Sequence, residues 1–518
     1  MINPQFFSVT EMIAINGRNR PNAIALQTSS EAVTWQNFDC LVNAAANALI
    51  GAGVNRGEPI ALLIDSSIWS WIQVFGVLRA GGVMTPLNTM LSPEALLALL
   101  VDSKATHLIV SANWNGLAGQ VLDRKIAAEH FPVLLAQDAS LPSSLDLPKL
   151  VAGAPKIPPT VVLRDQDPSN IIYSSGTTAQ PKGIVHTHGA RTATAAMLAV
   201  TFRCSATTRT LLTTPPHTNG SFMVLLPTIW VGGTVYISGG FNPDRYLDEV
   251  RDFRPTLAFM VPTMAQALVS NPKSRQIDWG SFDFIVTAGA PMPSELKRLT
   301  REMTGNRLGE LWGFTEGVAT VIQPHEMEER PASVGRPIGQ CEVRIVDSGD
   351  SEVEPGVVGE LVGRSAMMMA GYHMRPDADR DVIWRSPDGK EFLRTGDLGV
   401  KDADGWITIK GRKKDMLISG GLNIYPCDIE AVVLTHESVL DCTVIGVPHL
   451  KWGETPVAFV IPKTGCEIDA DKLKAWVNER VGRHQRIHDV VLTDAFPRNT
   501  LGKVMKFQIA ESYGTARL

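Results

Sequence analysis

Residues 171–188 decide the fold, and they read Ile171-Ile172-Tyr173-Ser174-Ser175-Gly176-Thr177-Thr178-Ala179-Gln180-Pro181-Lys182-Gly183-Ile184-Val185-His186-Thr187-His188. An apolar run typical of a β-strand breaks into hydroxyl residues around one glycine, and a proline and a lysine follow. Hydroxyl and backbone N–H groups donate hydrogen bonds to anionic oxygens, lysine adds positive charge, and glycine permits close approach. The stretch therefore predicts a loop that wraps a polyphosphate, although it lacks the Walker A pattern. The alternative is a Ser/Thr-rich surface turn with a solvated lysine.

The whole run resembles the phosphate loop of the adenylate-forming superfamily, which includes acyl-CoA synthetases, adenylation domains and luciferases. The family usually has threonine at the place of Ser174, which keeps the hydroxyl, and glycine at the place of Ala179, which implies a stiffer loop here. The resemblance implies that Thr178 is catalytic. The residues that it implies for ATP binding in this loop are Ser174, Ser175, Gly176, Thr177 and Lys182.

Composition narrows the class of protein. A chain of 518 residues exceeds one ordinary core, so we expect two or more domains. A net charge of −5 and the lack of a long basic run argue against nucleic-acid binding. The first residues carry no basic segment before an apolar core, so no signal peptide is expected. The longest apolar stretch, 222–237, contains Pro227 and two glycines, which favours a buried helix and strand over a membrane span.

The six cysteines are scattered, and no C-x-x-C occurs. The sequence therefore predicts neither a disulfide framework nor a zinc site. Free, mostly buried thiols in a reducing cytoplasm are the expectation.

Hydrophobic periodicity predicts alternating helices and strands up to about residue 260. Thr34 is expected to cap a helix that carries Phe38 and Leu49 on its apolar face. Other predicted elements are strands at 83–86, 107–110 and 257–260 and a helix at 243–253. Such alternation predicts the α/β class with parallel sheet. From Gly335 short strands separated by glycine and aspartate turns indicate a small β-rich unit, and about a hundred residues at the end indicate a small α+β domain.

We expect a large N-terminal adenylation domain over 1–411, built of layered α/β subdomains plus the β-rich unit, and a mobile C-terminal domain over 412–518. The charged stretch 411–415 lies between them. By itself it indicates an ordinary turn, whereas the resemblance implies a hinge at Lys414.

A second motif lies at 311–317, Leu-Trp-Gly-Phe-Thr-Glu-Gly. An aromatic ring can stack on a purine, glycine permits close approach, and a glutamate can bind Mg²⁺ on phosphates. The alternative is a buried aromatic and a solvated glutamate. The motif resembles the family's aromatic-Gly-x-Thr-Glu, with Trp where Tyr is commoner. The resemblance implies nucleotide binding by Trp312, Gly313, Phe314 and Thr315, and a catalytic and metal-binding role for Glu316.

Two further stretches follow the family order. Thr287-Ala288-Gly289-Ala290-Pro291 has small residues that suit a flat wall, and the resemblance implies that Gly289, Ala290 and Pro291 face adenine. Phe392-Leu393-Arg394-Thr395-Gly396-Asp397 resembles the ribose motif, because a carboxylate can accept hydrogen bonds from both hydroxyls. The resemblance implies ribose contacts for Asp397 and Arg412. Taken singly, each is equally a surface turn.

The last two matches lie near the C-terminus. Pro497-Arg498-Asn499-Thr500-Leu501-Gly502-Lys503 resembles the catalytic lysine motif, which implies that Lys503 is catalytic; the alternative is a solvated lysine. Ser419-Gly420-Gly421-Leu422-Asn423-Ile424-Tyr425-Pro426 resembles the loop that lines the thiol tunnel, which implies that Gly420 and Gly421 flank CoA; the alternative is a flexible turn.

The acyl pocket is predicted to be neutral. The stretch 213–222 has no acid, and neither it nor 287–291 offers an arginine or lysine for a second carboxylate. A lone histidine such as His217 is more often structural, but the family carries an aromatic or histidine motif here. The candidate pocket residues, Trp312 included, are His217, Asn219, Val261, Thr263, Ala288 and Val318.

The expected reaction joins a carboxylic acid, ATP and CoA, with Mg²⁺. Charge repulsion between the acid and ATP is offset by the phosphate loop, Glu316 and Lys503. The expected substrate is an apolar fatty or aromatic monocarboxylate. The alternatives are an amino-acid adenylation domain, a free-standing ligase that loads a carrier protein, and a non-catalytic nucleotide-binding homologue. A homodimer and a lysine acyltransferase acting on Lys503 are left open.

Overall fold

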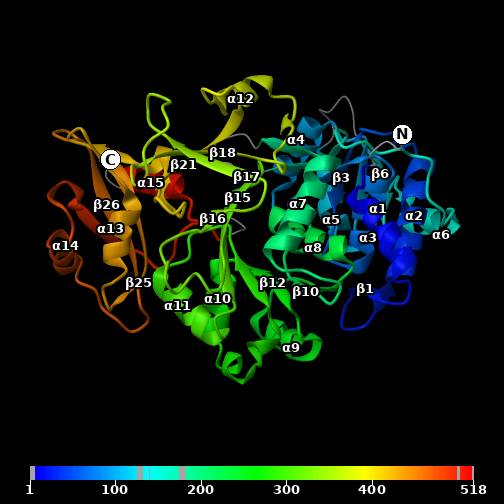
Figure 1. Ribbon diagram of the computed structural model, residues 1–518, viewed down its shortest axis with the longest axis horizontal. Helices are drawn as coiled ribbons and strands as arrows, with labels where there is room; N and C mark the ends of the chain where they lie inside the picture. Colours follow the sequence, from blue (N-terminus) through cyan, green and yellow to red (C-terminus); the bar gives the residue numbers. More distant parts are fainter. Residues whose placement is uncertain (1–5, 125–131, 139–140, 174–181, 499–501, 516–518) are drawn as a thin grey trace.

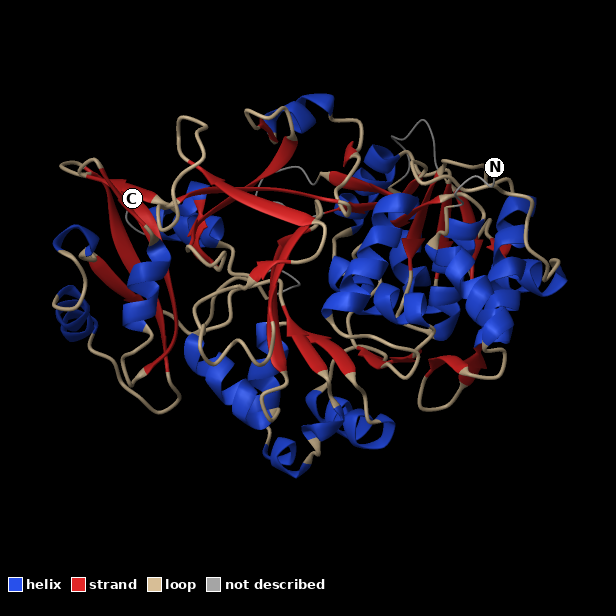
Figure 2. Cartoon of the chain, in the orientation of Figure 1, coloured by secondary structure: helices blue, strands red, loops and turns tan. Residues whose placement is uncertain are grey.

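The structure is a computed structural model, and it describes residues 6–124, 132–138, 141–173, 182–498 and 502–515. In the described part the strands form four sheets, and helices flank the two largest (Figure 2). The C-terminal residues form a separate body at one end of the molecule, opposite the N-terminal helices (Figure 1). The predicted α/β class, with a large N-terminal part and a small C-terminal part, is confirmed.

The first sheet contains the strands that flank the phosphate loop. Its order is β19 (Gly371–Tyr372), β9 (Gly183–Thr187), β8 (Pro168–Tyr173), β4 (Val83–Pro86), β3 (Pro59–Leu63), β5 (His107–Val110), β6 (Val133–Ala136) and β7 (Leu145–Asp146). The pairs from β4 to β7 are parallel, whereas β8–β9 and β9–β19 are antiparallel. The prediction of parallel sheet is thus wrong at this edge, because the phosphate loop is the connection of a hairpin.

The second sheet contains the strands before the small-residue wall and the Trp312 motif. Its order is β16 (Arg336–Pro337), β15 (Val318–Ile322), β14 (Leu308–Phe314), β13 (Phe284–Thr287), β12 (Leu257–Met260), β10 (Arg209–Leu212), β11 (Thr234–Ile237), β1 (Ile24–Gln27) and β2 (Ala32–Thr34). Strands β14 through β1 are parallel, and both edges are antiparallel. The Trp312 motif forms the hairpin β14–β15, so it also ends the parallel part of its sheet.

Helices of the large part pack between and outside these sheets. They are α1 (Val9–Asn19), α2 (Trp35–Gly51), α3 (Ile68–Arg79), α4 (Pro93–Ser103), α5 (Asn115–Asp123), α6 (Leu147–Gly153), α7 (His188–Thr201), α8 (Asn219–Val231), α9 (Pro243–Phe253), α10 (Pro262–Val269), α11 (Ser294–Met303) and α12 (Pro376–Asp381). The predicted cap is confirmed, because Thr34 accepts a hydrogen bond from the Asn37 amide. The helix at 243–253 and the strands at 83–86, 107–110 and 257–260 have the predicted bounds.

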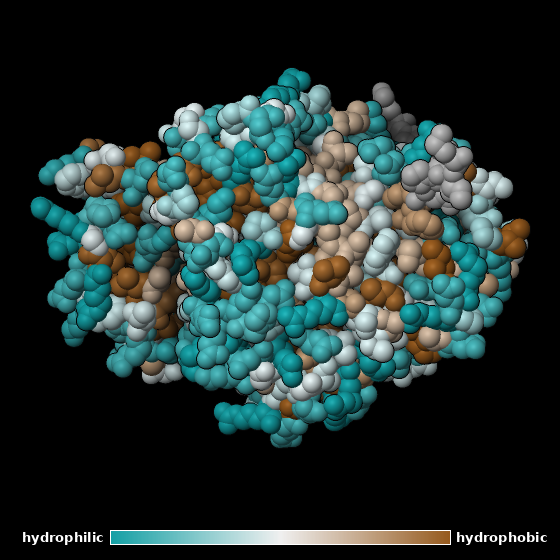
Figure 3. Space-filling view, in the orientation of Figure 1, coloured by the Kyte–Doolittle hydropathy of each residue, from teal (hydrophilic) through white to brown (hydrophobic). Residues whose placement is uncertain are grey.

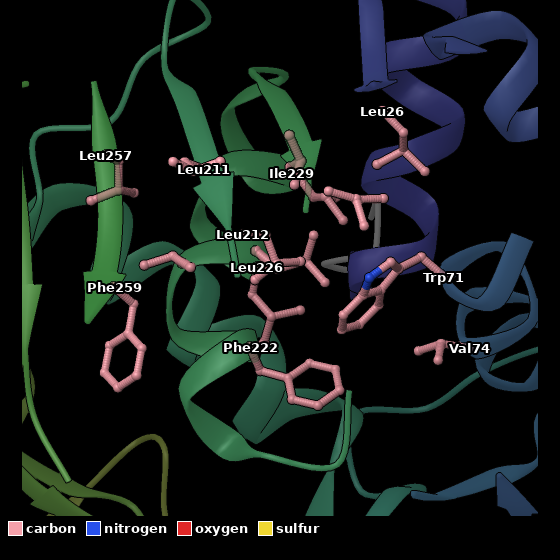
Figure 4. Packing of buried hydrophobic residues seen from close by; sticks show 14 of the residues in the cluster. Leu26, Trp71, Val74, Leu211, Leu212, Phe222, Leu226, Ile229, Leu257 and Phe259 are labelled. Carbon is pink, nitrogen blue, oxygen red and sulfur yellow. The ribbon is translucent and has the colours of Figure 1, made fainter. Parts of the chain in front are cut away.

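One hydrophobic core joins the two sheets. Trp71 on α3 meets Phe222 on α8 edge to face, with ring centroids 5.6 Å apart (Figure 4). Both side chains are buried, and aliphatic residues of α8, β10 and β12 surround them. The apolar stretch 222–237 is therefore the buried helix α8 followed by β11, as predicted. The packing of α3 against α8 therefore holds the two sheets in place relative to each other.

Two smaller sheets complete the chain. The β-rich unit comprises β17 (Cys341–Val346), β18 (Gly359–Ser365), β21 (Glu391–Lys401), β20 (Ile383–Arg385) and β22 (Ile407–Arg412). The C-terminal sheet comprises β23 (Leu417–Ser419), β24 (Leu422–Ile424), β25 (Val439–His449), β26 (Gly453–Pro462) and β27 (Asp489–Leu492). It packs with α13 (Pro426–Val433), α14 (Ala470–Asn478) and α15 (Lys506–Thr515) around a core of its own. A short 3-10 helix, Lys413–Asp415, connects β22 to β23.

Hydrophobic residues lie in scattered groups on the face shown in Figure 3. Of the helices in the described part, none has the length and apolar character needed to cross a membrane. All six cysteines are free, as predicted, but the expectation that most are buried is wrong. Only Cys442 is buried, Cys466 is exposed, and the other four are partly exposed.

Candidate active site

The ends of the phosphate loop are fixed side by side. Tyr173 at the end of β8 pairs with Gly183 at the start of β9. The Tyr173 hydroxyl donates to Asp102 Oδ2 at 2.7 Å, and Arg375 forms an ion pair with the same carboxylate. The predicted ATP-binding residues Ser174, Ser175, Gly176 and Thr177, and Thr178, lie outside the described residues, whereas Lys182 is described.

Asp397 is the centre of the predicted ribose site. Its Oδ2 accepts from the Trp312 indole Nε1 at 2.9 Å, and its Oδ1 lies 2.8 Å from Arg412 Nε. Arg412 also donates to the Thr395 carbonyl at 3.1 Å, and strands β21 and β22 pair Asp397 directly with Arg412. Burial raises the pKa of Asp397, while the Arg412 charge and the indole hydrogen bond lower it. The structure therefore brings three of the predicted nucleotide residues into contact.

Lys503 lies beside this group. Its pKa is lowered by burial and by the Arg412 charge, and the Asp397 carboxylate opposes that shift, so the three charges interact. Its neighbour Gly502 packs against Thr263 of α10: a Cβ at Gly502 would lie 2.9 Å from Thr263 Cγ2. The C-terminal part thus rests on the large part here, and the Lys503 ammonium is near enough to the predicted ribose pair for their charges to interact.

Glu316 lies on the turn between β14 and β15. Burial raises the pKa of its carboxyl, and the Tyr372 hydroxyl, which donates to Oε1 at 2.9 Å, opposes that shift together with the Arg412 and Lys182 charges. His186 on β9 bonds through Nε2 to the Thr315 carbonyl at 2.8 Å, which holds the turn against the first sheet. Tyr372 therefore holds the carboxylate itself, and His186 holds the backbone of the turn that carries it.

A divalent cation suits this carboxylate only together with phosphate ligands. No cluster of three or more histidine, cysteine, aspartate or glutamate side chains that could hold a metal occurs in the part of the chain that is described. Magnesium commonly takes one or two protein carboxylates and completes its shell with water and substrate phosphates. A single oriented Glu316 fits that mode and fits no all-protein metal cage.

The small-residue wall lies one strand from Trp312. Residues 288–291 connect β13 to α11, and β13 runs parallel to β14 with Thr287 opposite Glu310. Gly289 has φ +92, a conformation that favours glycine, and both Gly289 and Pro291 are exposed while Ala288 is buried. The ring centroids of Trp312 and Phe314, on the neighbouring strand β14, lie 6.3 Å apart. An open strip of backbone thus runs beside the aromatic motif.

The predicted acyl-pocket stretches follow the carboxyl ends of neighbouring parallel strands. β10 leads to His217 and Asn219, β12 to Val261 and Thr263, and β13 to Ala288. This edge of an α/β sheet is where ligands usually bind. Burial lowers the pKa of His217 to about 4, so its imidazole is neutral at pH 7, and its Nε2 has no hydrogen-bond partner among the described residues.

Two pocket candidates make contacts elsewhere in the structure. Val318 is buried in the core of the β-rich unit, where Gly363 packs on it and Val343 and Leu361 belong to the same cluster. Thr263 is exposed and contacts Gly502. Nothing in these contacts turns either side chain to the strand ends that carry His217.

One charged residue near the predicted pocket escaped the sequence interpretation. The buried guanidinium of Arg191 on α7 donates to Asn219 Oδ1 at 2.9 Å and to Asn170 Oδ1 at 2.6 Å, and it lies over the Phe222 ring. Burial lowers its pKa to about 9. Arg191 stands 28 residues before Asn219, outside the stretch 213–222 on which the prediction of a neutral pocket rested. Its place among the buried residues of α7 is the feature of the sequence that could have indicated it.

The predicted tunnel and hinge residues lie on the C-terminal side. Gly420 and Gly421, with φ +58 and +81, form the tip of the β23–β24 hairpin. The Gly420 amide donates to the Trp452 carbonyl at 2.8 Å, and the Trp452 ring packs against it. Lys414 is exposed in the connecting 3-10 helix. In this arrangement Lys503, and not the hairpin tip, is the element beside Asp397.

Comparisons with known proteins span nearly the whole chain. The model of the AMP-binding enzyme family matches residues 13–373, and that of the AMP-binding enzyme C-terminal domain matches 428–503. A feruloyl-CoA synthase of Amycolatopsis sp is 33% identical over 501 residues, which cover 96% of this chain and 97% of the relative. An indoleacetate–CoA ligase of Aromatoleum aromaticum is 30% identical over 514 residues, 97% of this chain and 98% of the relative.

A solved structure has the same fold over the full length. The anthranilate CoA ligase AuaEII in complex with anthranoyl-AMP superposes with a TM-score of 0.88 at 25% identity. The superposition covers 100% of this chain and 99% of that chain. Both the large and the small part of the chain therefore have counterparts.

Proposed function

The chain belongs to the AMP-binding enzyme family and is an AMP-forming acid–CoA ligase, and we propose that its acid is an aromatic or other apolar monocarboxylate. The observation that carries the proposed chemistry is the convergence of Asp397, Trp312, Arg412 and Lys503 from four separate stretches of sequence. Two motif residues already bond Asp397, so a ribose at this carboxylate enters a fixed arrangement.

The first half-reaction joins two anions. A carboxylate oxygen of the acid attacks the α-phosphorus of ATP, the bond to the pyrophosphate oxygen breaks, and acyl-AMP forms. Lys503 offsets the negative charge that develops on the α-phosphate, and Lys182 offsets charge at the phosphate loop. Magnesium, when bound with ATP, neutralises phosphate charge, and Glu316 is the residue that would hold it.

The second half-reaction needs no protein nucleophile. The sulfur of CoA attacks the acyl carbon of the mixed anhydride, the bond to the AMP oxygen breaks, and the thioester leaves with AMP. We place the thiol path at the Gly420–Gly421 hairpin, because two glycines leave room for a narrow pantetheine chain. In this structure the charge that interacts with Asp397 from the small domain is that of Lys503, so a thiol path at the hairpin requires the small domain to turn.

The neutral pocket supports a monocarboxylate. Along the strand ends, His217 is uncharged and Ala288 and Val261 are apolar. A buried cation near them, Arg191, donates to Asn170 and Asn219. The relatives named for ferulate and indoleacetate, which are aromatic acids, point to the same class of substrate.

A panel of acids tests the proposal. Aromatic and fatty monocarboxylates are each paired with the dicarboxylate of the same body, and pyrophosphate, AMP and thioester are measured with ATP and CoA. We expect the aromatic monocarboxylates to turn over and their dicarboxylate partners to fail by at least tenfold in kcat/KM. A dicarboxylate that matches its partner would overturn the substrate class.

The same panel separates the acceptors. Replacing CoA with a phosphopantetheinylated carrier protein should give no thioester. Thioester formed on the carrier alone would favour the carrier-loading ligase instead. If none of the acids in the panel led to pyrophosphate release, the result would favour a non-catalytic nucleotide-binding homologue.

A further inference from the structure

The segment 365–375 joins the phosphate-loop hairpin to the Glu316 turn. Its strand β19 extends the first sheet beside β9, with Gly371 opposite Val185 and Tyr372 opposite Ile184. The Ala370 amide donates to the Val185 carbonyl at 2.8 Å, and the His373 amide donates to the Gly183 carbonyl at 2.7 Å. The segment is therefore registered on the strand that begins one residue after Lys182.

The same segment holds the backbone of the Glu316 turn. The Met369 amide donates to the Glu316 carbonyl at 2.8 Å, and the Ser365 hydroxyl donates to the Gly317 carbonyl. Gly317 has φ +111, and a Cβ there would lie 2.2 Å from the Met367 carbonyl oxygen. Only glycine permits this approach, so turn and segment form one unit.

The side chain of Tyr372 connects the two charged groups at the site. Its hydroxyl donates to Glu316 Oε1 at 2.9 Å. The ammonium of Lys182 lies over its ring, 4.9 Å from the centroid, a cation–π contact. One tyrosine thus holds an anion at its hydroxyl and a cation at its face.

Glu316 and Lys182 carry opposite charges, and Tyr372 contacts both of them. The Lys182 charge lowers the pKa of Glu316, so the groups are near enough to interact, yet the two side chains, both within the described chain, form no ion pair at 4.0 Å or less. A direct pair would neutralise both groups before the nucleotide arrives. Tyr372 occupies one carboxylate oxygen and one side of the ammonium instead.

We propose that Tyr372 is a positioning residue that keeps the Glu316 carboxylate and the Lys182 ammonium apart and oriented for the metal–nucleotide complex. The inference rests on the proposed function, in which these two groups meet that complex. It assigns no chemical step to the tyrosine. Its hydroxyl remains a donor, because burial and the Glu316 charge raise its pKa.

Binding of Mn²⁺·ATP, followed by electron paramagnetic resonance, tests this without turnover. Tyr372→Phe keeps the ring under Lys182 and removes the hydroxyl. We expect affinity to fall about tenfold, the loss of one hydrogen bond to a charged group, with the thermal midpoint near that of the wild type. Tyr372→Leu, which also removes the ring, should bind more weakly than Tyr372→Phe.

The matched control is a second tyrosine-to-phenylalanine change, which removes a hydroxyl group away from the site. The Tyr246 hydroxyl on α9 is buried and has no hydrogen-bond partner among the described residues, so Tyr246→Phe should leave Mn²⁺·ATP binding unchanged. Wild-type affinity in Tyr372→Phe would overturn the inference. So would an equal loss in Tyr246→Phe, because the effect would then not depend on the site.

A double-mutant cycle with Glu316→Gln separates positioning from general structure. If Tyr372 acts through Glu316, then Tyr372→Phe costs little further affinity in the Glu316→Gln background. Additive losses would overturn the inference and leave the metal role of Glu316 intact. Unchanged Mn²⁺·ATP binding in Glu316→Gln alone would overturn that role in the proposed function, and the Tyr372 inference with it.

Discussion

The indole Nε1 of Trp312 donates a hydrogen bond of 2.9 Å to Oδ2 of Asp397. The bond joins the second sheet to the β-rich unit, because Trp312 lies on β14 and Asp397 on β21. It leaves the carboxylate oriented from both sides, by the indole and by Arg412. The predicted adenine and ribose motifs are therefore bonded directly to each other.

Asp397→Ala should raise the KM for ATP. The ribose hydroxyls lose their acceptor, and Trp312 and Arg412 lose their partner, so we expect a cost of roughly 1.5–3 kcal/mol, or about ten- to a hundredfold. Asp381→Ala, on exposed α12, is the matched control and should have no effect. Pyrophosphate release measured against ATP concentration gives the answer, and an unchanged KM and kcat in Asp397→Ala would remove the ribose assignment.

The stability of the large part should fall in mild acid. Burial lowers the pKa of His188 to about 4, from about 6.5 in the unfolded chain. Between those pH values the unfolded chain binds a proton at His188 and the folded chain does not. The contribution of His188 to the free energy of unfolding is therefore fully present above pH 6.5 and is lost as the pH falls towards 4, a change of up to about 3 kcal/mol. Denaturant unfolding at pH 7 and pH 5 measures it.

His188→Gln should flatten that pH dependence. His325→Gln, at an exposed position, is the matched control and should leave the slope as in the wild type. Equal slopes in wild type and His188→Gln would contradict the assignment.

Adenylate formation should fall on the alkaline side at a lower pH than an ordinary lysine permits. Burial and the Arg412 charge lower the pKa of Lys503, so its ammonium is lost as the pH rises through that lowered value. Thioester formation from supplied acyl-adenylate should not share this limb. Lys503→Arg should shift the limb to higher pH, since arginine keeps its charge. A limb common to both half-reactions would point to another group.

Lys414→Pro should impair only the second half-reaction. Proline fixes φ at the connection between β22 and β23, where the small domain is proposed to turn. Adenylate formation, which uses the arrangement seen here, should continue. Lys414→Ala is the control for the lost side chain and should retain both half-reactions. Equal loss of both in Lys414→Pro, in a folded protein, would place the pivot elsewhere.

Much of the fold could be predicted from local signals. Caps such as Thr34 and apolar runs such as 107–110 define single elements, and the structure has them where expected. The antiparallel edge at β19 could not be predicted, because it depends on long-range pairing: β19 reaches β9 from residue 371. A strand of two residues, Gly371–Tyr372, is too short to have a hydrophobic periodicity that could predict its pairing with β9.

The site divides in the same way. The sequence motifs were enough to predict Asp397, Trp312 and Glu316 as site residues, because the residue types and the order of the motifs along the chain are specific. The contacts between them were beyond the sequence, as were Tyr372 and Arg191, which bond residues of distant stretches. Val318 shows the reverse case: it was among the neutral pocket candidates, whereas its side chain packs in the core of the β-rich unit.

The central claim is that Lys503 serves adenylate formation alone, and that the small domain carries it away before the thiol enters. The structure supports the first part, with Lys503 beside Asp397 and Gly502 packed on Thr263. In the second part the Gly420–Gly421 hairpin would replace it. Modification of Lys503 that removes its charge should therefore act like its loss.

The most direct test assays both half-reactions in Lys503→Ala. Pyrophosphate release from acid and ATP measures the first, and thioester formed from supplied acyl-adenylate and CoA measures the second. The account predicts that the first is abolished and the second proceeds near the wild-type rate. Equal loss of both half-reactions in a variant that remains folded would contradict it.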